Sequence, residues 1–449
     1  NHFMNINPLG CENCSAKGSI KTPLEIGKKY RNENILVPDT HDDKNGAALP
    51  GHSEYVLKDG ALYFAHDNPN GAPTYTKISS YQVKIQSLHV GEVKNNQNYV
   101  LLRHYKPHTG WHEAELKASE LLGDKTVAIM ADLGSVIHDR IHFQMYVRDS
   151  IDYLRQKQKE EMQYEQFGWK NSNKSFLYGD TLYSSNSIAT TAINQDLRFR
   201  AQWLCPVAGG SVEKWKDAVD CLFGRGSEGM SFTILASFAS VLMRFLEENE
   251  GGAIVSLMTR HSGAGKTTTL SGAYTVWASN MHALGLTTID TKVAKSLSLG
   301  ALGNLPAFYD EFTDKDPEVI KNFIEMFTNG RDKKRGTSSG ELQNSLLTWQ
   351  MLLISAGNQS LVDTIRSTGK SEAPSMRILE FGVESSGDML QSRLMALAKQ
   401  LHANAGHAGA EYLKYLIQPG TLEVIYYQLP RIIDEIMKNC SFQKQHRFW

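Results

Sequence analysis

The sequence predicts an α/β protein with a parallel-sheet core, a β-rich α+β region before it and a helical segment after it. The apolar run Ala253-Ile-Val-Ser-Leu-Met leads into a Gly-rich turn and then a helical pattern over 267–278. Two further apolar runs end in polar side chains, at Asp310 and at Asn358. Over 54–102, short alternating runs are separated by Gly and Asn turns, which is typical of β-strands.

Length and composition are those of a globular protein. The chain has 449 residues, of which 41% are hydrophobic and 21% charged, enough for two or three domains. Its 47 basic and 48 acidic residues give a formal net charge of -1, which excludes coating of DNA by bulk charge but not a local basic element. The most apolar stretch, 230–243, is too short to span a bilayer, and no secretory signal opens the sequence. We therefore expect a cytoplasmic protein with no membrane partner.

Changes in composition predict the domain boundaries. Within the β-rich domain, helical patterns are expected at 113–122 and 143–163. The expected segments are a linker or arm over 1–50, a β-rich N-terminal domain over 51–165, a connecting α+β region over 166–250, the parallel-sheet core over 251–385 and a C-terminal helical segment over 386–449.

The five cysteines are too scattered to form a disulfide scaffold. Cys11 and Cys14 form a CxxC pair, which is half of a zinc site, but no second CxxC or HxxxH follows at the expected distance. Two free thiols are the favoured interpretation of this pair, and a zinc site stays the alternative.

Residues 261–268, His-Ser-Gly-Ala-Gly-Lys-Thr-Thr, predict a phosphate-binding loop. The pattern G-x-x-x-x-G-K-[ST] between a strand and a helix is the setting that such a loop requires. The Gly-Lys-Thr of this pattern is present, but Arg260 stands at the position of the first Gly, and Gly263 is expected to supply the missing backbone freedom. The candidate nucleotide-binding residues are Ser262, Gly263, Ala264, Gly265, Lys266, Thr267 and Thr268.

Each part of this loop has a physical role in holding ATP with Mg²⁺. Backbone N–H groups at the positive end of the following helix would face the phosphates. Lys266 would reach the β- and γ-phosphate oxygens, and the Thr267 hydroxyl would bind Mg²⁺.

Two later apolar runs supply polar groups suited to the same site. Asp310 would hold Mg²⁺ through water, and the adjacent Glu311 would polarise the attacking water. Asn358 would sense the γ-phosphate and orient that water. The plainer interpretations are an exposed acidic turn and an Asn in a turn after a strand. A weaker pattern at 287–293 predicts the strand between the loop and Asp310.

A basic segment lies between the second and third apolar runs. Arg331, Lys333, Lys334 and Arg335 stand against Asp332, so this Gly-flanked tip is positive. A positive hairpin suits contact with a nucleic-acid backbone in a narrow pore. A solvated surface turn is an equally good interpretation of the composition.

Together these segments resemble the domain-of-unknown-function 927 family of phage and mobile-element proteins, which is similar to superfamily 3 and AAA+ replicative helicases. The resemblance extends over about residues 52–449 and rests on blocks that occur in the family's order. These blocks are Phe167-Gly-Trp with Phe176-Leu-Tyr, the loop at 261–268, Tyr309-Asp-Glu-Phe, 327–336, 349–358 with Leu361-Val-Asp, Pro374-Ser-Met-Arg-Ile-Leu-Glu and 406–413.

The resemblance implies an AAA+/superfamily 3-like ATPase core that assembles into a ring, usually a homohexamer. Arg377 would be the arginine finger that reaches the γ-phosphate of a neighbouring subunit, with Arg366 as a second candidate. The basic tip would grip single-stranded or forked DNA in the pore. Family members are often joined to a primase, so a primase domain or protein is an implied partner. This sequence departs from the family at Arg260 and at Asn358, where members often carry other polar residues.

We therefore expect an ATP-dependent, ring-forming DNA helicase or translocase that acts in phage or mobile-element replication, in the host cytoplasm if it is phage-encoded. The alternative is a nucleotide-gated assembly or helicase-loading factor without unwinding activity. A metabolic kinase would share the loop but would need neither a basic hairpin nor a trans arginine. The catalytic candidates are Lys266, Asp310, Glu311, Asn358 and Arg377.

Overall fold

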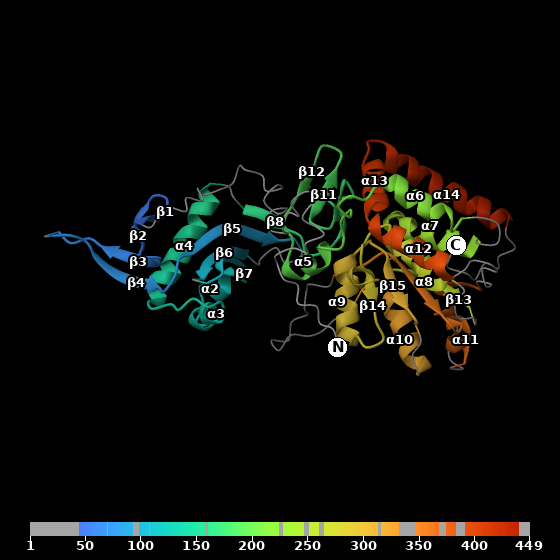
Figure 1. Ribbon diagram of the computed structural model, residues 1–449, viewed down its shortest axis with the longest axis horizontal. Coiled ribbons are helices and arrows are strands. Elements are labelled where there is room, and N and C mark those ends of the chain that lie inside the picture. The colour runs from blue at the N-terminus through green and yellow to red at the C-terminus, as the bar shows by residue number, and fades with distance from the viewer. Residues whose placement is uncertain are drawn as a thin grey trace, which may run out of the picture. The chain divides into compact units, whose positions relative to one another are not determined.

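The computed structural model of the chain (Figure 1) divides into two compact units. One comprises Asn1–Gln86, Leu102–Glu113 and Lys125–Ser150, and the other comprises Ser87–Leu101, Ala114–Asp124 and Ile151–Trp449. Cys11 and Cys14 lie outside the described residues. The structure describes residues 45–69, 71–92, 98–106, 108–157, 160–223, 228–246, 251–259, 265–312, 316–331, 347–367, 374–382 and 391–439.

The first unit contains an antiparallel sheet with strand order β1-β2-β3-β4, which confirms the predicted β-rich region. Tyr55 of β2 is buried, and its ring packs edge-on against Tyr146 of α4 at 5.2 Å. The Tyr55 hydroxyl donates a 2.5 Å hydrogen bond to Asp149 on the same helix. The elements are β1 (Asn45–Leu49), β2 (His52–Lys58), β3 (Ala61–His66), β4 (Thr74–Ser79), α3 (Thr126–Asp132) and α4 (Arg140–Gln156).

A second four-stranded sheet has the order β7-β6-β5-β8, and it corrects two predicted helices. The segment predicted as a helix at 113–122 continues the hairpin strand β7 after the left-handed Gly110 (φ 79°) and becomes helical at α2. Pairing of β7 with the preceding strand β6 here overrides the helix propensity of Glu, Ala and Leu. The helix predicted over 143–163 ends with α4, and its last residues form β8. The elements are β5 (Val83–Gly91), β6 (Asn98–Lys106), β7 (Gly110–Lys117), α2 (Ala118–Leu121) and β8 (Glu160–Gln163).

The Gly-Trp block of the sequence braces the second unit. The Trp169 backbone N–H donates to the Asn304 side-chain oxygen at 3.0 Å, and its indole N–H donates to the Val241 carbonyl at 2.7 Å. Gly168 has φ 100°, and a Cβ there would lie 2.5 Å from the same Asn304 oxygen. The elements of this region are β9 (Gly168–Lys170), β10 (Ser175–Tyr178), β11 (Thr181–Ser184), β12 (Ile188–Thr190), α5 (Gln195–Ala201), α6 (Val212–Asp220), α7 (Glu228–Ala239) and η1 (Ser240–Phe245).

The centre of the second unit is a five-stranded, wholly parallel sheet with strand order β14-β15-β16-β13-β17. This confirms the predicted α/β class. Buried apolar residues dominate β13, β15 and β16, as expected for strands covered on both faces. The elements are β13 (Ala253–Met258), α8 (Lys266–Tyr274), η2 (Met281–Ala283), β14 (Gly285–Leu286), α9 (Lys292–Leu302), β15 (Ala307–Asp310), α10 (Pro317–Thr328), β16 (Leu352–Gly357), α11 (Leu361–Arg366), η3 (Ser375–Arg377) and β17 (Ile378–Gly382).

The strand predicted at 287–293 lies earlier in the chain than expected. The strand is the two-residue β14, and Thr291 instead caps α9 by accepting a hydrogen bond from the Ala294 backbone N–H at 3.2 Å. A Thr that satisfies a free N–H group of a helix is a preferred N-cap. The apparent β pattern was therefore a helix start.

The right-handedness of the crossovers determines which face of this sheet each helix covers. The chain runs from β13 to β14 in one direction across the sheet and then returns through β15 and β16 to β17. Since crossovers between parallel strands are right-handed, α8 covers one face, and α9, α10 and α11 cover the other. In keeping with this, α8 packs with α7 and α12 (Gln391–Ala403), whereas α10 packs with α11. The adjacent ends of β13 and β16 thus form a topological switch point.

The described residues from 391 to 439 form the helices α12, α13 (His407–Leu416) and α14 (Thr421–Asn439). The α13 helix packs closely, because a Cβ at Gly409 would lie 2.5 Å from the ring of the fully buried Trp277. Among the described helices, none has both the length and the hydropathy needed to span a membrane.

Candidate nucleotide site

The carboxyl edge of the parallel sheet carries Lys266, Asp310, Glu311 and Asn358, together with the start of α8. In the strand register, Met258 pairs with Gly357, and Asp310 pairs with Ala356. The ends of β13, β16 and β15 are therefore level, and roughly 10 Å separates the first from the third at ~4.8 Å per strand. Ligands of open parallel sheets bind outside the carboxyl ends of strands, at a switch point such as this one.

Gly265 sets the start of the helix that follows the loop. Its φ of 85° is left-handed, and it precedes α8 directly as the N-cap, where a side chain would be strained. The Thr267 side chain lies exposed in the first turn and Thr268 is buried. Arg260, Ser262, Gly263 and Ala264 lie outside the described residues.

Lys266 spans the switch point. Its ammonium donates a short hydrogen bond to the Asn358 side-chain oxygen and longer ones to the carbonyls of Thr259 (3.3 Å) and Gly357 (3.4 Å). These oxygens come from residues that directly follow β13 or end β16. The structure thus brings Lys266 and Asn358 together.

The two carboxylates stand at the end of the neighbouring strand. Asp310 is the last residue of β15, and Glu311 follows it with φ 50°. A Glu in the left-handed region costs about 1–3 kcal/mol and recurs at functional sites. Both side chains are exposed at this edge.

The pKa of Asp310 reports its surroundings. Partial withdrawal from bulk water raises this pKa, and the charge of Glu311 raises it further. The Glu311 backbone N–H and the Lys266 ammonium act in the opposite direction. The effect of Lys266 on Asp310 places the loop lysine and the carboxylate in one electrostatic site.

The donors at this edge fit Mg²⁺. Thr267 and Asp310 offer a hydroxyl and a carboxylate oxygen, and Mg²⁺ prefers hard oxygen ligands together with water and phosphate. Both side chains are exposed at the carboxyl edge. A magnesium ion would be held there between the first turn of α8 and the tip of β15.

Lys295 supports the carboxylate strand and escaped the sequence prediction. Its side chain is buried; the ammonium donates to the Tyr309 hydroxyl at 2.9 Å and lies 5.2 Å from the centre of that ring. Tyr309 directly precedes Asp310, and Phe312 packs on it at 4.3 Å. The residues on either side of the two carboxylates are therefore fixed by packing.

Glu380 also escaped prediction, although it ties β17 to the turn that carries Asn358. One carboxylate oxygen accepts a short hydrogen bond from the Ser360 hydroxyl, and the other accepts a 2.7 Å bond from the Leu361 backbone N–H. Ser360 in turn caps α11 through the Asp363 N–H at 3.0 Å. The turn after β16 is therefore fixed from both sides.

Arg377 lies at the other edge of the sheet. It directly precedes β17, whose strand runs parallel to β13, so it stands at the amino edge, away from Lys266. Its guanidinium donates a short hydrogen bond to the Thr328 hydroxyl and a 3.5 Å bond to the Asn329 side chain, at the end of α10. Arg366 is exposed at the end of α11.

The base of the predicted basic hairpin is also at the amino edge. Arg331 and Thr348 form an antiparallel bridge, and the Trp349 backbone N–H donates to the Gly330 carbonyl at 2.8 Å. The two ends of this segment are thus paired as a hairpin requires. Lys333, Lys334 and Arg335 lie outside the described residues.

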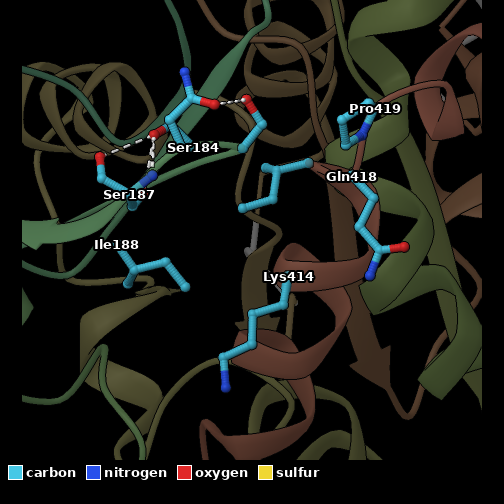
Figure 2. Close-up of a pocket in the computed structure, with 9 residues that line it drawn as sticks. Ser184, Ser187, Ile188, Lys414, Gln418 and Pro419 are labelled. Carbon is cyan, nitrogen blue, oxygen red and sulfur yellow. Dashed lines mark hydrogen bonds between the residues drawn. The ribbon is translucent and has the colours of Figure 1, made fainter.

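A hollow elsewhere in the second unit is not the predicted site. It has a volume of about 390 Å³ and lies between the β11–β12 turn and the end of α13 (Figure 2). Ser184 and Ser187 hydrogen-bond each other there, and Lys414 pairs with Glu411 at 2.5 Å. None of the predicted site residues lines it.

Comparisons with known proteins agree with this architecture. The solved structure of SCCmec type IV Cch, described as an active helicase, is similar with a TM-score of 0.61 over 87% of this chain and 69% of that chain, at 13% identity. NtrX from Brucella abortus aligns over 45% of this chain and 53% of its own with a TM-score of 0.23, at 12% identity, too low to support an argument. No protein of curated function matches the sequence. Residues 55–346 match the family described as a domain of unknown function (DUF927), and the chain belongs to that family.

Proposed function

We propose that this chain is an ATP-dependent, ring-forming DNA helicase or translocase with a superfamily 3-like AAA+ core, acting in phage or mobile-element replication. The observation that carries the proposal is the Lys266–Asn358 hydrogen bond at the switch point, beside Asp310. A phosphate-binding lysine, a polar strand tip and a carboxylate pair meet at one edge. That combination supports phosphoryl transfer to water.

Each residue has a distinct task in hydrolysis. Lys266 and the N–H groups at the start of α8 bind the phosphates, and Asn358 orients the γ-phosphate end and the water. Glu311 accepts the proton of the attacking water. Thr267 and Asp310 would hold magnesium, which would supply positive charge beside the phosphates.

The strand order supports the AAA+ assignment. Strand β16 lies between the loop strand β13 and the carboxylate strand β15. Asn358 follows this inserted strand, so it stands at a strand tip between the loop strand and the carboxylate strand, which supports a role in orienting the attacking water. The likeness of the fold to Cch, described as an active helicase, favours the same class.

The position of Arg377 supports assembly into a ring, as a homohexamer. An arginine at the amino edge cannot reach the phosphates at the carboxyl edge of its own sheet. A neighbouring subunit whose carboxyl edge faces this amino edge would receive it. The hairpin base at Arg331 and Thr348 lies at the same edge, so the basic tip and the trans arginine would move together and act on single-stranded or forked DNA.

Strand displacement on a forked DNA substrate tests this function. The wild-type chain should separate the strands with ATP and Mg²⁺, and Lys266→Ala should abolish both hydrolysis and displacement. Lys333→Ala/Lys334→Ala should keep hydrolysis and lose displacement. ATP hydrolysis without any displacement by the wild type would instead identify the loading factor that remodels a partner, such as a primase or helicase.

A further inference from the structure

Four side chains of the first unit form a basic and aromatic cluster, here called the Trp111 face. It consists of Lys84 on β5, Arg103 and Tyr105 on β6, and Trp111 on β7. Successive side chains of a strand alternate between the two sides of a sheet. Leu102 and His104, which flank Arg103, are buried, so the Trp111 face is the side that points away from that core.

The cluster is centred on the indole. The Lys84 ammonium lies 5.3 Å from the centre of the Trp111 ring, and the Arg103 guanidinium carbon lies 5.4 Å from it. The Tyr105 ring meets the same indole edge-on at 5.7 Å. Arg103 also forms an ion pair with Glu113, with 3.7 Å between its Nε and the carboxylate oxygen. Three adjacent strands thus bring two half-buried aromatic rings, two cations and one carboxylate together on one side of the sheet.

We propose that the Trp111 face binds single-stranded DNA. A base would stack on the indole beside Tyr105, and Lys84 and Arg103 would turn to the flanking phosphates. Stacking accepts every base because each has a π-face, and cations next to the ring add backbone contacts. This site goes beyond the proposed function: it assigns a DNA contact to the first unit, independent of ATP hydrolysis in the second.

Charge complementarity favours a nucleic acid as the occupant. The chain as a whole has a formal net charge of -1, so the pairing of two cations with two rings is a local feature. An acidic peptide would satisfy the cations but would leave the indole without a stacking partner.

The test measures binding of a fluorescein-labelled oligo(dT) to the full chain by anisotropy, without nucleotide. Lys333→Ala/Lys334→Ala is the background, so that the predicted pore hairpin contributes little. Trp111→Ala should weaken binding by about tenfold or more, the usual effect of removing one stacked base contact. Trp111→Phe should recover most of the affinity. Lys84→Ala/Arg103→Ala should flatten the log–log salt dependence by about 0.7 for each lost phosphate contact.

A matched pair in the same unit provides the control. Lys58 lies 4.9 Å from the ring of Tyr75, which is 43% exposed, so Lys58→Ala/Tyr75→Ala removes a similar contact elsewhere. That variant should bind oligo(dT) like the background. Melting temperatures show whether each variant is folded. If Trp111→Ala does not fold, Lys84→Ala/Arg103→Ala tests the proposal in its place.

Two results would overturn the proposal. In one, the charge variant keeps full affinity and an unchanged salt slope, or the Lys58→Ala/Tyr75→Ala control loses as much as the test variants. In the other, poly-glutamate competes as well as oligo(dT), which reduces the face to a charge contact. Loss of oligo(dT) binding in Trp111→Ala would support DNA binding by the Trp111 face even if the wild type hydrolysed no ATP. The DNA-binding proposal and the proposed ATPase function can therefore fail independently.

Discussion

The ammonium of Lys266 and the side-chain oxygen of Asn358 are hydrogen-bonded across the boundary between β13 and β16. We therefore propose that Asn358 responds to the phosphate that Lys266 would bind. We expect Asn358→Ala to bind ATP with nearly unchanged affinity and to hydrolyse it about 10²-fold more slowly, the usual effect of removing one preorganised polar group from a charged transition state. Steady-state kinetics and nucleotide titration measure the two quantities. Gln359→Ala, at the exposed next position, should behave like the wild type; equal losses in both variants would refute a role specific to Asn358.

Arg377 is predicted to act on a neighbouring subunit. Arg377→Ala should hydrolyse ATP roughly 10³-fold more slowly, as for other trans arginines, and Glu311→Gln should be inactive as well. A mixture of the two variants should regain activity. In such a mixture, some ATP sites lie between two different variants. Where the Arg377→Ala subunit binds ATP, it supplies an intact Glu311, and its Glu311→Gln neighbour supplies an intact Arg377.

The contacts of Arg377 with Thr328 and Asn329 offer a purely structural explanation for its loss. That explanation predicts a lower melting temperature in Arg377→Ala and no gain on mixing. The same mixing experiment with Arg366→Ala decides between the two arginines, because only the true finger complements Glu311→Gln.

The raised pKa of Asp310 predicts a pH dependence of magnesium binding. An ordinary Asp has a pKa of 3.8, and a raised value means that this carboxylate takes up a proton at a higher pH. A protonated carboxylate does not bind a metal ion, so Mg²⁺ affinity should fall as the pH drops through the raised pKa. Titration of nucleotide-bound protein with Mg²⁺ at several pH values measures this. Asp310→Asn should bind Mg²⁺ weakly, without that pH dependence; an equal dependence in the variant would assign the effect to another group.

Glu380 is predicted to position Asn358 without touching the nucleotide. Glu380→Ala removes both hydrogen bonds to the turn after β16, and small displacements at a reacting centre can cost about 10²-fold in rate. We expect kcat to fall while the ATP dissociation constant stays unchanged. Glu380→Gln retains an oxygen for the Leu361 N–H and should recover most of kcat.

Glu411, an exposed carboxylate on α13 that pairs with Lys414, is the matched control for Glu380. Glu411→Ala should leave kcat unchanged. A double variant Glu380→Ala/Asn358→Ala should be no slower than Asn358→Ala, because both changes disturb one unit; fully additive losses would show that Glu380 acts elsewhere.

The Gly168 position predicts a stability effect. Gly168→Ala and Gly209→Ala both place a side chain at positive φ, which costs about 1–2 kcal/mol. At Gly209 a Cβ would meet nothing within 4 Å, whereas at Gly168 it would lie 2.5 Å from Asn304. Thermal unfolding should therefore show a larger loss for Gly168→Ala. Equal losses would mean that the Trp169 segment moves aside freely.

The sequence predicted those features of the fold that depend on a short run of consecutive residues. The strand after Gly252, the helix that follows Gly265 and the strand tips at Asp310 and Asn358 were predictable, because buried parallel strands are continuous apolar runs and Gly-Lys-Thr is typical of a helix start after such a strand. The loop prediction itself falls on residues 260–264, which lie outside the described residues. The helix predicted at 113–122 was wrong because hairpin pairing of β7 with β6 outweighs the helix propensity of the residues in this segment.

The residues that escaped prediction act through contacts between separate segments. Glu380 binds Leu361, 19 residues before it, and Lys295 binds Tyr309, 14 residues after it. Nothing local marks either residue, since a Glu in a strand and a Lys in a helix are ordinary. The edge on which Arg377 lies likewise follows from strand order, which one sequence does not reveal.

The left-handed backbone of Glu311 has a consequence for laboratory evolution. Glycine and asparagine adopt this conformation at lower cost than glutamate. A selection for thermal stability would therefore favour replacement of Glu311. The stabilised variants would lack the proposed general base. Mutant libraries designed to raise the melting temperature of this protein should leave position 311 unchanged, because thermal stability and the proposed ATP hydrolysis make opposite demands on that residue.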